Sequence, residues 1–282
     1  MQCDSNIQKT GKVYNFDSEG YLVCKQEFSN IQENYKKPLD HIISFYINSI
    51  FNSGIHSIYV RGSVASGQAY ENISDLDILI VFYKNFTEPA RYDFIQTNNV
   101  LNKDIQQMYP FITRVDILPT FVSSLGEKPF DRFLLKHFSV CLYGDDLRNH
   151  ISKFTLDDLS DRSYFFLQRT IDETLLHFLD NIKINRIANS KPLLNQALKD
   201  MTWICKKIIR IGFNLVLDDI RMYTRDLYQC SKFFSKIYPE KEKDIAMVLE
   251  KCIKPTNKYN DLDKILDFGY WLVEKLKEKN GN

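Results

Sequence analysis

The sequence has almost no excess of charge of either sign, and it lacks the features of several special classes of protein. Its 37 Lys and Arg and 36 Asp and Glu leave a formal net charge of +1, so no overall basic field indicates nucleic-acid binding. No apolar run reaches the roughly 18 residues of a membrane-spanning helix, and residues 1–5 are too polar for a signal peptide. The six cysteines are scattered, with no C-x-x-C pair or Cys/His cluster, which indicates reduced thiols. We therefore expect a cytoplasmic protein.

The first half of the chain alternates between helical and strand patterns. Its 282 residues, 44% of them hydrophobic, suffice for one large or two ordinary domains. Residues 1–30 are the hardest to interpret, although a small hairpin of 13–16 with 21–24 fits their pattern. After them we expect a helix that starts near Pro38 and ends at a left-handed Gly54. The elements predicted next are strands at 57–60 and 75–82, a helix at 91–108, a strand at 111–118 ended by Pro119, and a strand at 140–144.

From about residue 150 the apolar residues recur with the helical period of 3.6. The helices predicted there cover 164–182, 194–215, a segment capped by Thr224, 240–251 and 262–276. The predicted fold is thus an α/β (α+β) domain with a small mixed sheet over residues 1–149, which includes the 1–30 extension. An all-α helical bundle follows over residues 150–282.

One stretch of the first half has the character of a phosphate-and-metal site. Gly62-Ser63 follows a predicted strand, and eleven residues later Asp75-Leu76-Asp77 opens another. Alternation along a strand places Asp75 and Asp77 on one face, and two converging carboxylates suit the oxygen-preferring Mg²⁺ ion. The glycine turn offers backbone N–H groups to phosphate oxygens.

A second Asp-Leu-Asp triplet in the chain serves as a comparison for this pattern. Asp261-Leu-Asp263 repeats the triplet, but it starts a predicted helix and has no Gly-Ser upstream, so we interpret it as surface charge. For Asp75 and Asp77 the alternative is an exposed edge strand. Burying two like charges together without a cation would cost several kcal/mol.

These residues resemble the nucleotidyltransferase superfamily of the polymerase-β type, in which a third carboxylate follows on a later strand, here Asp116. The resemblance implies that Asp75, Asp77 and Asp116 hold two Mg²⁺ ions, and that Asp116 also acts as the base for the acceptor hydroxyl. The alternative is that Asp116 is a buried or capping residue. Gly62, Ser63 and Ser74 would contact the nucleotide. The implied reaction is in-line attack of a hydroxyl on the α-phosphorus of a nucleoside triphosphate, with release of pyrophosphate.

The second half resembles the helical domain of aminoglycoside adenylyltransferases, especially the streptomycin/spectinomycin type. The resemblance rests on Arg210-Ile211-Gly212-Phe213 and Tyr223-Thr224-Arg225-Asp226. It implies that Arg210 and Arg225 reach the triphosphate across an interdomain cleft, that Tyr223 stacks on the base, and that Lys206 shares the phosphate-binding role. The alternative is that these are solvated helix charges.

The sequence departs from that family in three respects. The spacing between the two arginines is about two residues longer than in the family, and Asp116 stands where the family has Glu. The acidic residues that hold a cationic drug cannot be placed, although Asp200 and Glu173 are possible. These departures bear on the acceptor rather than on the reaction.

Three hypotheses follow. The leading one is a monomeric, Mg²⁺-dependent enzyme that moves AMP from ATP to a hydroxyl of a small molecule, most naturally an aminoglycoside-like antibiotic. The second keeps this chemistry but has a protein or RNA acceptor, as in toxin–antitoxin systems; the near-neutral charge is unfavourable for nucleic acid. The third is a catalytically silent nucleotide-binding module, which the complete set of carboxylates makes less favourable.

Overall fold

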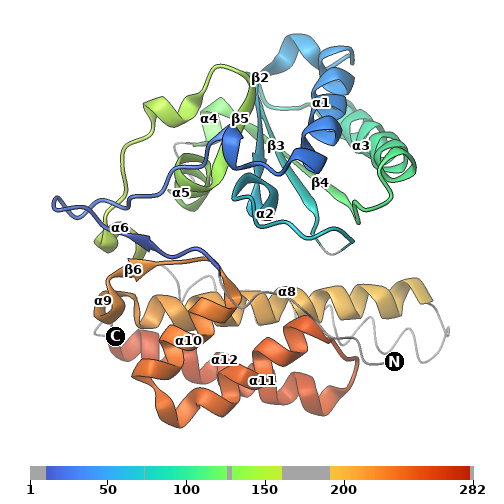
Figure 1. Ribbon diagram of the computed structural model, residues 1–282. Helices are drawn as coiled ribbons and strands as arrows, with labels where there is room; N and C mark the ends of the chain where they lie inside the picture. The colour runs from blue at the N-terminus through green and yellow to red at the C-terminus, as the bar shows by residue number, and fades with distance from the viewer. Residues whose placement is uncertain (1–10, 73, 126–128, 161–190, 280–282) are drawn as a thin grey trace. The chain divides into compact units, whose positions relative to one another are not determined.

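The computed structural model describes residues 11–72, 74–125, 129–160 and 191–279 (Figure 1). The chain divides into two compact units. The sheet unit is Cys24–Lys153, and the helical unit combines Phe154–Asn282 with Met1–Val23. Each unit is described by itself below.

The sheet unit is built on a four-stranded mixed sheet in the order β4-β3-β2-β5. β2 pairs antiparallel with β3 and with β5, whereas β3 and β4 are parallel. A parallel pair needs a long crossover, and the crossover here is α3. The strands are β2 (Ile55–Arg61), β3 (Leu76–Phe82), β4 (Val115–Phe121) and β5 (Ser139–Gly144). The α/β class predicted from the sequence is confirmed.

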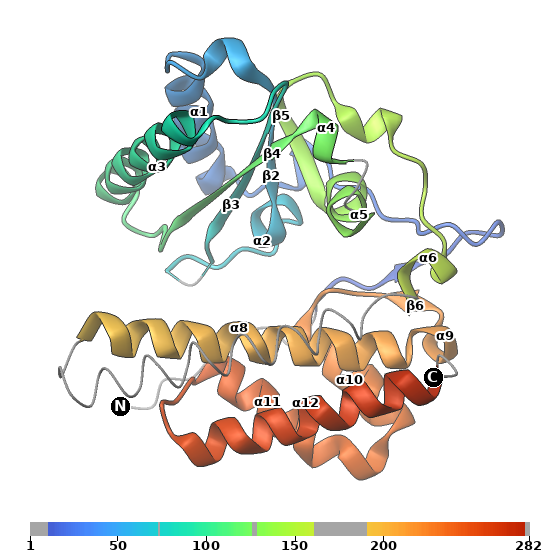
Figure 2. The same cartoon turned by 180° about the vertical axis from the view of Figure 1, so that it is seen from behind.

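Helices cover the sheet. α1 (Glu33–Ile47) and α3 (Glu88–Met108) lie together on one side of it, and α5 (Pro129–Phe138) lies on the other (Figures 1 and 2). Five of the last six residues of β3 are buried. This is expected for an apolar strand that is covered on both faces. The remaining short elements are η1 (Phe28–Asn30), η2 (Asn52–Gly54), α2 (Gly62–Ala65), α4 (Val122–Leu125) and η3 (Leu147–His150).

Two predicted elements in this unit have the wrong start and the wrong end. The first helix starts at Glu33, so Pro38 lies inside it, and Gly54 does not have the left-handed conformation but ends a 3₁₀ turn before β2. The third strand starts at Val115, because Phe111 instead accepts a hydrogen bond from the Asn72 N–H at 2.8 Å. That strand runs through Pro119, since β4 is an edge strand and a proline is tolerated there.

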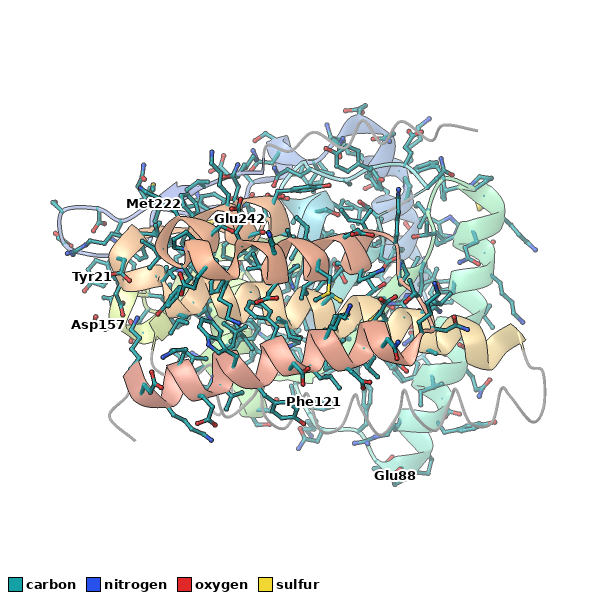
Figure 3. All side chains as sticks on the ribbon, turned by 90° about the horizontal axis from the view of Figure 1, so that it is seen from below. Tyr21, Glu88, Phe121, Asp157, Met222 and Glu242 are labelled. Atoms are coloured by element: carbon teal, nitrogen blue, oxygen red, sulfur yellow. The ribbon has the colours of Figure 1, made fainter. Side chains whose placement is uncertain are left out.

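The helical unit is a bundle around α8. α8 (Lys191–Leu215) packs against α10 (Leu227–Ile237), α11 (Glu242–Ile253) and α12 (Tyr259–Lys279), and α8, α11 and α12 lie roughly alongside one another (Figures 1–3). α6 (Leu156–Ser160), α9 (Leu217–Ile220) and η4 (Pro239–Lys241) are short. Side chains at the helical period form the core, which confirms the predicted C-terminal bundle. The helix predicted at 164–182 lies outside the described residues.

The N-terminal segment belongs to the helical unit. The predicted hairpin forms, with a bridge between Phe16 and Leu22 and a turn at a left-handed Gly20. Its first strand, β1 (Tyr14–Asn15), pairs with β6 (Met222–Tyr223); Met222 is labelled in Figure 3. The division by contacts therefore differs from the predicted domain of residues 1–149 at its N-terminal end.

Two further features concern the described residues. None of the helices there is both long and apolar enough to traverse a lipid bilayer. The cysteines described, Cys24, Cys141, Cys205, Cys230 and Cys252, are free thiols.

Candidate active site

The glycine turn after β2 is shaped by its closeness to a carboxylate. Gly62 has a φ of +69° and a Cβ added there would lie 2.2 Å from Asp77 Oδ2. Any other residue would be strained in its backbone and would also collide with the carboxylate. The turn continues into α2, where the Ser63 carbonyl accepts hydrogen bonds from Ser66 Oγ at 3.0 Å and the Gln68 N–H at 2.8 Å.

The three carboxylates predicted from the sequence meet at one end of β3 and β4. Asp77 is the second residue of β3, and the parallel register makes Asp116 of β4 its partner. Asp75 directly precedes β3, two residues before Asp77 and hence on the same face. The side chains of Asp75 and Asp116 are 39% and 41% exposed, so both are open to a ligand. The structure thus brings together these residues and the turn at Gly62; their roles in catalysis stay predictions.

Two neighbouring side chains that the sequence analysis missed also belong to this cluster. Arg114 forms an ion pair with Asp116, and its Nη2 lies 3.8 Å from Asp75 Oδ2. The Thr113 hydroxyl donates to Asp75 Oδ1 at 2.8 Å. The sequence does contain a signal for Arg114, because this residue stands two positions before Asp116 and therefore on the same face of the extended chain. The pairing with Asp75, however, depends on the register between two strands.

The donor set suits a magnesium ion, since three aspartates supply the carboxylate oxygens that Mg²⁺ prefers. In the described part of the chain, however, no three His, Cys, Asp or Glu side chains are grouped closely enough to hold a metal ion. Asp75 and Asp116 turn toward Arg114 instead. The residues fit a metal by their chemistry and position, but they would have to turn from Arg114 to bind it.

Ser74 has a structural task within the loop that precedes Asp75. Its hydroxyl accepts a hydrogen bond from the Tyr70 N–H at 2.9 Å, and its own N–H donates to the Tyr70 carbonyl at 2.9 Å. Its carbonyl accepts from the Thr113 hydroxyl at 3.2 Å. Ser74 therefore fixes the loop, and a nucleotide contact through it stays a prediction.

The predicted phosphate-binding residues lie in the helical unit. Arg210 and Lys206 are one turn apart on α8, and Arg225 follows β6. Burial, together with the positive charge of Arg225, lowers the pKa of the Arg210 guanidinium to about 10. The Arg210 Nε is buried with no hydrogen-bond partner within the described residues. Two arginines held close enough to raise each other's energy would attract a multivalent anion.

The stacking role predicted for Tyr223 conflicts with its burial. Its side chain is only 6% exposed, and its ring lies edge-on to Phe213 with the centroids 6.0 Å apart. Burial also raises the pKa of its hydroxyl. Within the helical unit, Tyr223 is a core residue that pairs with Tyr14.

Thr224 does not cap α10, contrary to prediction. The N-cap is Asp226, whose Oδ1 accepts from the Gln229 N–H at 2.9 Å. Thr224 is buried and its hydroxyl donates to the Lys12 carbonyl at 2.8 Å and accepts from the Asp226 N–H. The hydroxyl thus ties the N-terminal segment to the residues that begin α10, next to Arg225.

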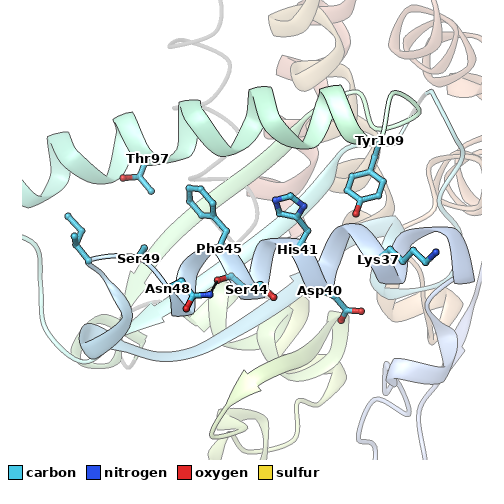
Figure 4. A pocket seen from close by; sticks show the side chains of 10 residues that line it. Lys37, Asp40, His41, Ser44, Phe45, Asn48, Ser49, Thr97 and Tyr109 are labelled. Carbon is cyan, nitrogen blue, oxygen red and sulfur yellow. Dashed lines mark hydrogen bonds between the residues drawn. The ribbon is translucent and has the colours of Figure 1, made fainter.

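A hollow of about 870 Å³ lies between α1 and α3, away from the carboxylates (Figure 4). His41 and Tyr109 line it, and His41 Nε2 lies 2.8 Å from Asp104 Oδ2. None of the predicted site residues is among its lining residues. The hollow marks the outer joint of two helices and is not the predicted site.

The comparison with protein families agrees with the carboxylate pattern. Residues 46–136 match the family described as "Nucleotidyltransferase domain", and this range includes the glycine turn and all three carboxylates. The chain therefore contains a nucleotidyltransferase domain, which confirms the enzyme class predicted from the sequence. No curated protein matches the chain.

One solved structure to which the chain is similar is spectinomycin adenyltransferase AAD(9) from Enterococcus faecialis, crystallised with ATP and spectinomycin. The match has a TM-score of 0.48 and 13% sequence identity, and covers 86% of this chain and 98% of the other. A likeness this weak does not decide what this chain binds.

Proposed function

We propose that this chain, which contains a nucleotidyltransferase domain, transfers AMP from ATP to a hydroxyl of a small molecule and releases pyrophosphate. The observation that carries the proposal is the meeting of Asp75, Asp77 and Asp116 beside the left-handed Gly62. All of them lie within the matched residues. A cytoplasmic location belongs to the proposal, in keeping with the free thiols.

In the proposed reaction the three carboxylates hold two Mg²⁺ ions. Such ions, when bound, lower the pKa of an acceptor hydroxyl and stabilise the charge of the leaving pyrophosphate. Asp116 takes the proton of the acceptor hydroxyl. The acceptor oxygen forms a bond to the α-phosphorus, and the bond from that phosphorus to the bridging oxygen breaks, so that pyrophosphate leaves with the electron pair.

The other residues hold the nucleotide in line for this displacement. The backbone N–H groups after Gly62 and the Ser63 hydroxyl would contact phosphate oxygens. Arg210 and Arg225, with Lys206, would bind the triphosphate from the helical unit. The Nε of Arg210 is buried and has no hydrogen-bond partner among the described residues, which supports this role because an anion would supply a partner.

The acceptor is proposed to be a cationic, aminoglycoside-like molecule. The support is the sequence pattern around Arg210 and Arg225, which resembles that of aminoglycoside adenylyltransferases. The formal charge of +1 argues against a long nucleic acid, whose phosphates reward a basic surface.

A pair of substitutions tests the reaction. Asp75→Asn with Asp77→Asn should lower pyrophosphate release with an active acceptor by at least about 100-fold, because it removes two ligands of the ions that stabilise the transition state. The assay screens ATP with a panel of aminoglycosides. Asp263→Asn is the matched control, since it alters the other Asp-Leu-Asp at an exposed position of α12; it should leave the rate unchanged. Unchanged release by the double variant would contradict the proposal.

The acceptor class has its own test. Cell lysate labelled with ATP carrying the label on its α-phosphate should contain labelled small molecules only. A labelled protein or RNA band would overturn the small-molecule acceptor and leave the transfer chemistry in place. Calorimetry that showed ATP binding without Mg²⁺ dependence and no transfer would instead indicate a silent module.

A further inference from the structure

We propose that Arg114 is a displaceable counter-ion of the carboxylate cluster, a positioning residue that weakens divalent-cation binding until its guanidinium leaves. The inference rests on the proposed function, because it takes Asp75 and Asp116 as metal ligands. It assigns a task to a cation that the sequence analysis did not single out.

The backbone fixes Arg114 beside the carboxylates. The Arg114 carbonyl accepts a hydrogen bond from the Leu76 N–H at 2.8 Å, which ties its residue to the strand between Asp75 and Asp77. From there the guanidinium pairs with Asp116 and reaches Asp75 at 3.8 Å. It thus links the carboxylate of Asp116 in β4 to that of Asp75, which directly precedes β3.

The charges explain why such a cation is needed. Three carboxylates at one end of a sheet repel one another when nothing neutralises them. Arg114 supplies one positive charge, and the Thr113 hydroxyl supplies a hydrogen bond to Asp75. With these contacts in place, the carboxylates among the described residues are not grouped closely enough to hold a metal ion.

The guanidinium is free to leave. Its side chain is 44% exposed, and a pair of exposed charges is held only weakly in water. A divalent cation that binds the same oxygens repels the guanidinium and takes its place. The metal ion therefore binds in exchange for the Arg114 guanidinium, and the positive charge of Arg114 lowers the affinity for the metal.

Titration of the protein with Mn²⁺ in the absence of nucleotide tests this exchange. Unbound Mn²⁺ is counted by its electron paramagnetic resonance signal. We expect Arg114→Gln to bind Mn²⁺ about fivefold more tightly than the wild type at low ionic strength, the size expected for removal of an exposed like charge. The difference should shrink at about 0.5 M salt, where surface charges are screened. A purely structural Arg114 would give weaker metal binding in the variant.

Two variants serve as controls. Arg114→Lys keeps the charge, so its Mn²⁺ affinity should stay within about twofold of the wild type. Arg91→Gln removes the same charge from an exposed position of α3, beyond the far end of β3, about 23 Å from Asp75 along that strand. It should change nothing.

Asp77→Asn separates this inference from the function beneath it. If Asp77→Asn abolishes Mn²⁺ binding while Arg114→Gln behaves as the wild type, the metal site stands and the role of Arg114 is overturned. If Asp77→Asn leaves Mn²⁺ binding unchanged, the metal site and the proposed function fail together.

Discussion

Arg210 is half-buried, and the Nε atom of its charged guanidinium is shielded from water. Its pKa is lowered to about 10 by burial and by the neighbouring Arg225, so the fold favours the neutral form. Unfolding therefore takes up a proton from about pH 10 up to the ordinary pKa of an arginine, and stability rises with pH across that window. At neutral pH the charged form carries its full cost. A residue that weakens the fold in this way is better explained by ligand binding than by stability.

We predict that Arg210→Met raises stability and weakens nucleotide binding. Removing the buried charge should increase the free energy of unfolding at pH 7 by about 1–2 kcal/mol, while ATP affinity falls at least tenfold through the lost phosphate contact. Urea unfolding and calorimetry measure the two effects. Lys206→Met, at an exposed position one turn earlier, should weaken ATP binding without the gain in stability. A variant less stable than the wild type would count against this account.

At this scale the sequence predicts the carboxylates and misses their partner. Spacing and alternation are enough to group Asp75 with Asp77, because both follow from one strand. Arg114 reaches Asp75 only through the register of β3 with β4, which the sequence does not state. The pairing of Tyr223 with Tyr14, more than 200 residues away in the chain, is another contact that the sequence does not state.

Among the elements, the connection from β2 to α2 sets the geometry of the site. Gly62 begins α2 with a φ of +69°, and a Cβ there would meet the Asp77 carboxylate. Gly20 also has a positive φ, +83°, but a Cβ there would meet nothing within 4 Å. The two glycines therefore separate the cost of the left-handed backbone from the cost of the collision.

We predict that Gly62→Ala displaces Asp77 and that Gly20→Ala does not disturb the site. Both changes should cost about 1 kcal/mol of stability for the backbone conformation. Only Gly62→Ala should also lower the rate of transfer, by at least about tenfold, and weaken Mn²⁺ binding. Thermal unfolding, pyrophosphate release and the Mn²⁺ titration provide the three readouts. Equal activity in both variants would show that the contact with Asp77 has no functional weight.

Element types were easier to predict than element ends. The apolar period identifies α8, α11 and α12, and β-branched runs identify β2 and β3, because burial imposes these patterns directly. Pro38 predicts the start of a helix and Pro119 the end of a strand, but the helix begins before its proline and the edge strand continues past its own. The cap of α10 moved from Thr224 to Asp226 because the threonine hydroxyl bonds to Lys12 instead.

For the molecule as a whole, the N-terminal segment decides where the units divide. Residues before Cys24 pair with the helical unit through β1 and β6. Those from Cys24 onward join the sheet unit: Cys24 Sγ donates to the His137 carbonyl at 3.1 Å, and Arg148 Nη1 donates to the Gln26 carbonyl at 2.8 Å. The change of the hydrophobic period near residue 150 predicts a boundary there. The passage of the chain from one unit to the other within the first thirty residues, in contrast, changes no hydrophobic period.

We predict that the fragment of residues 24–153 folds by itself, whereas a fragment of residues 31–153 is markedly weaker. The shorter fragment loses the partner of His137, because the Cys24 carbonyl lies 2.8 Å from its Nδ1. It also loses the Gln26 carbonyl, one of the two carbonyls that accept from Arg148 Nη1, and keeps the other, that of Ser139. Each unsatisfied buried group costs about 1–3 kcal/mol, so the shorter fragment should melt at least about 10 °C lower.

Burial lowers the pKa of His137, so its stabilising effect is present above pH 6.5 and is lost as the pH falls below that value. The hydrogen bond to the Cys24 carbonyl raises the pKa of His137, so its loss makes the protonated form still less favourable in the shorter fragment, and the gap between the fragments should widen in acid. Circular dichroism melts at pH 7.5 and pH 5.5 measure this, and equal melting of the two fragments at pH 7.5 would place residues 24–30 outside the sheet unit.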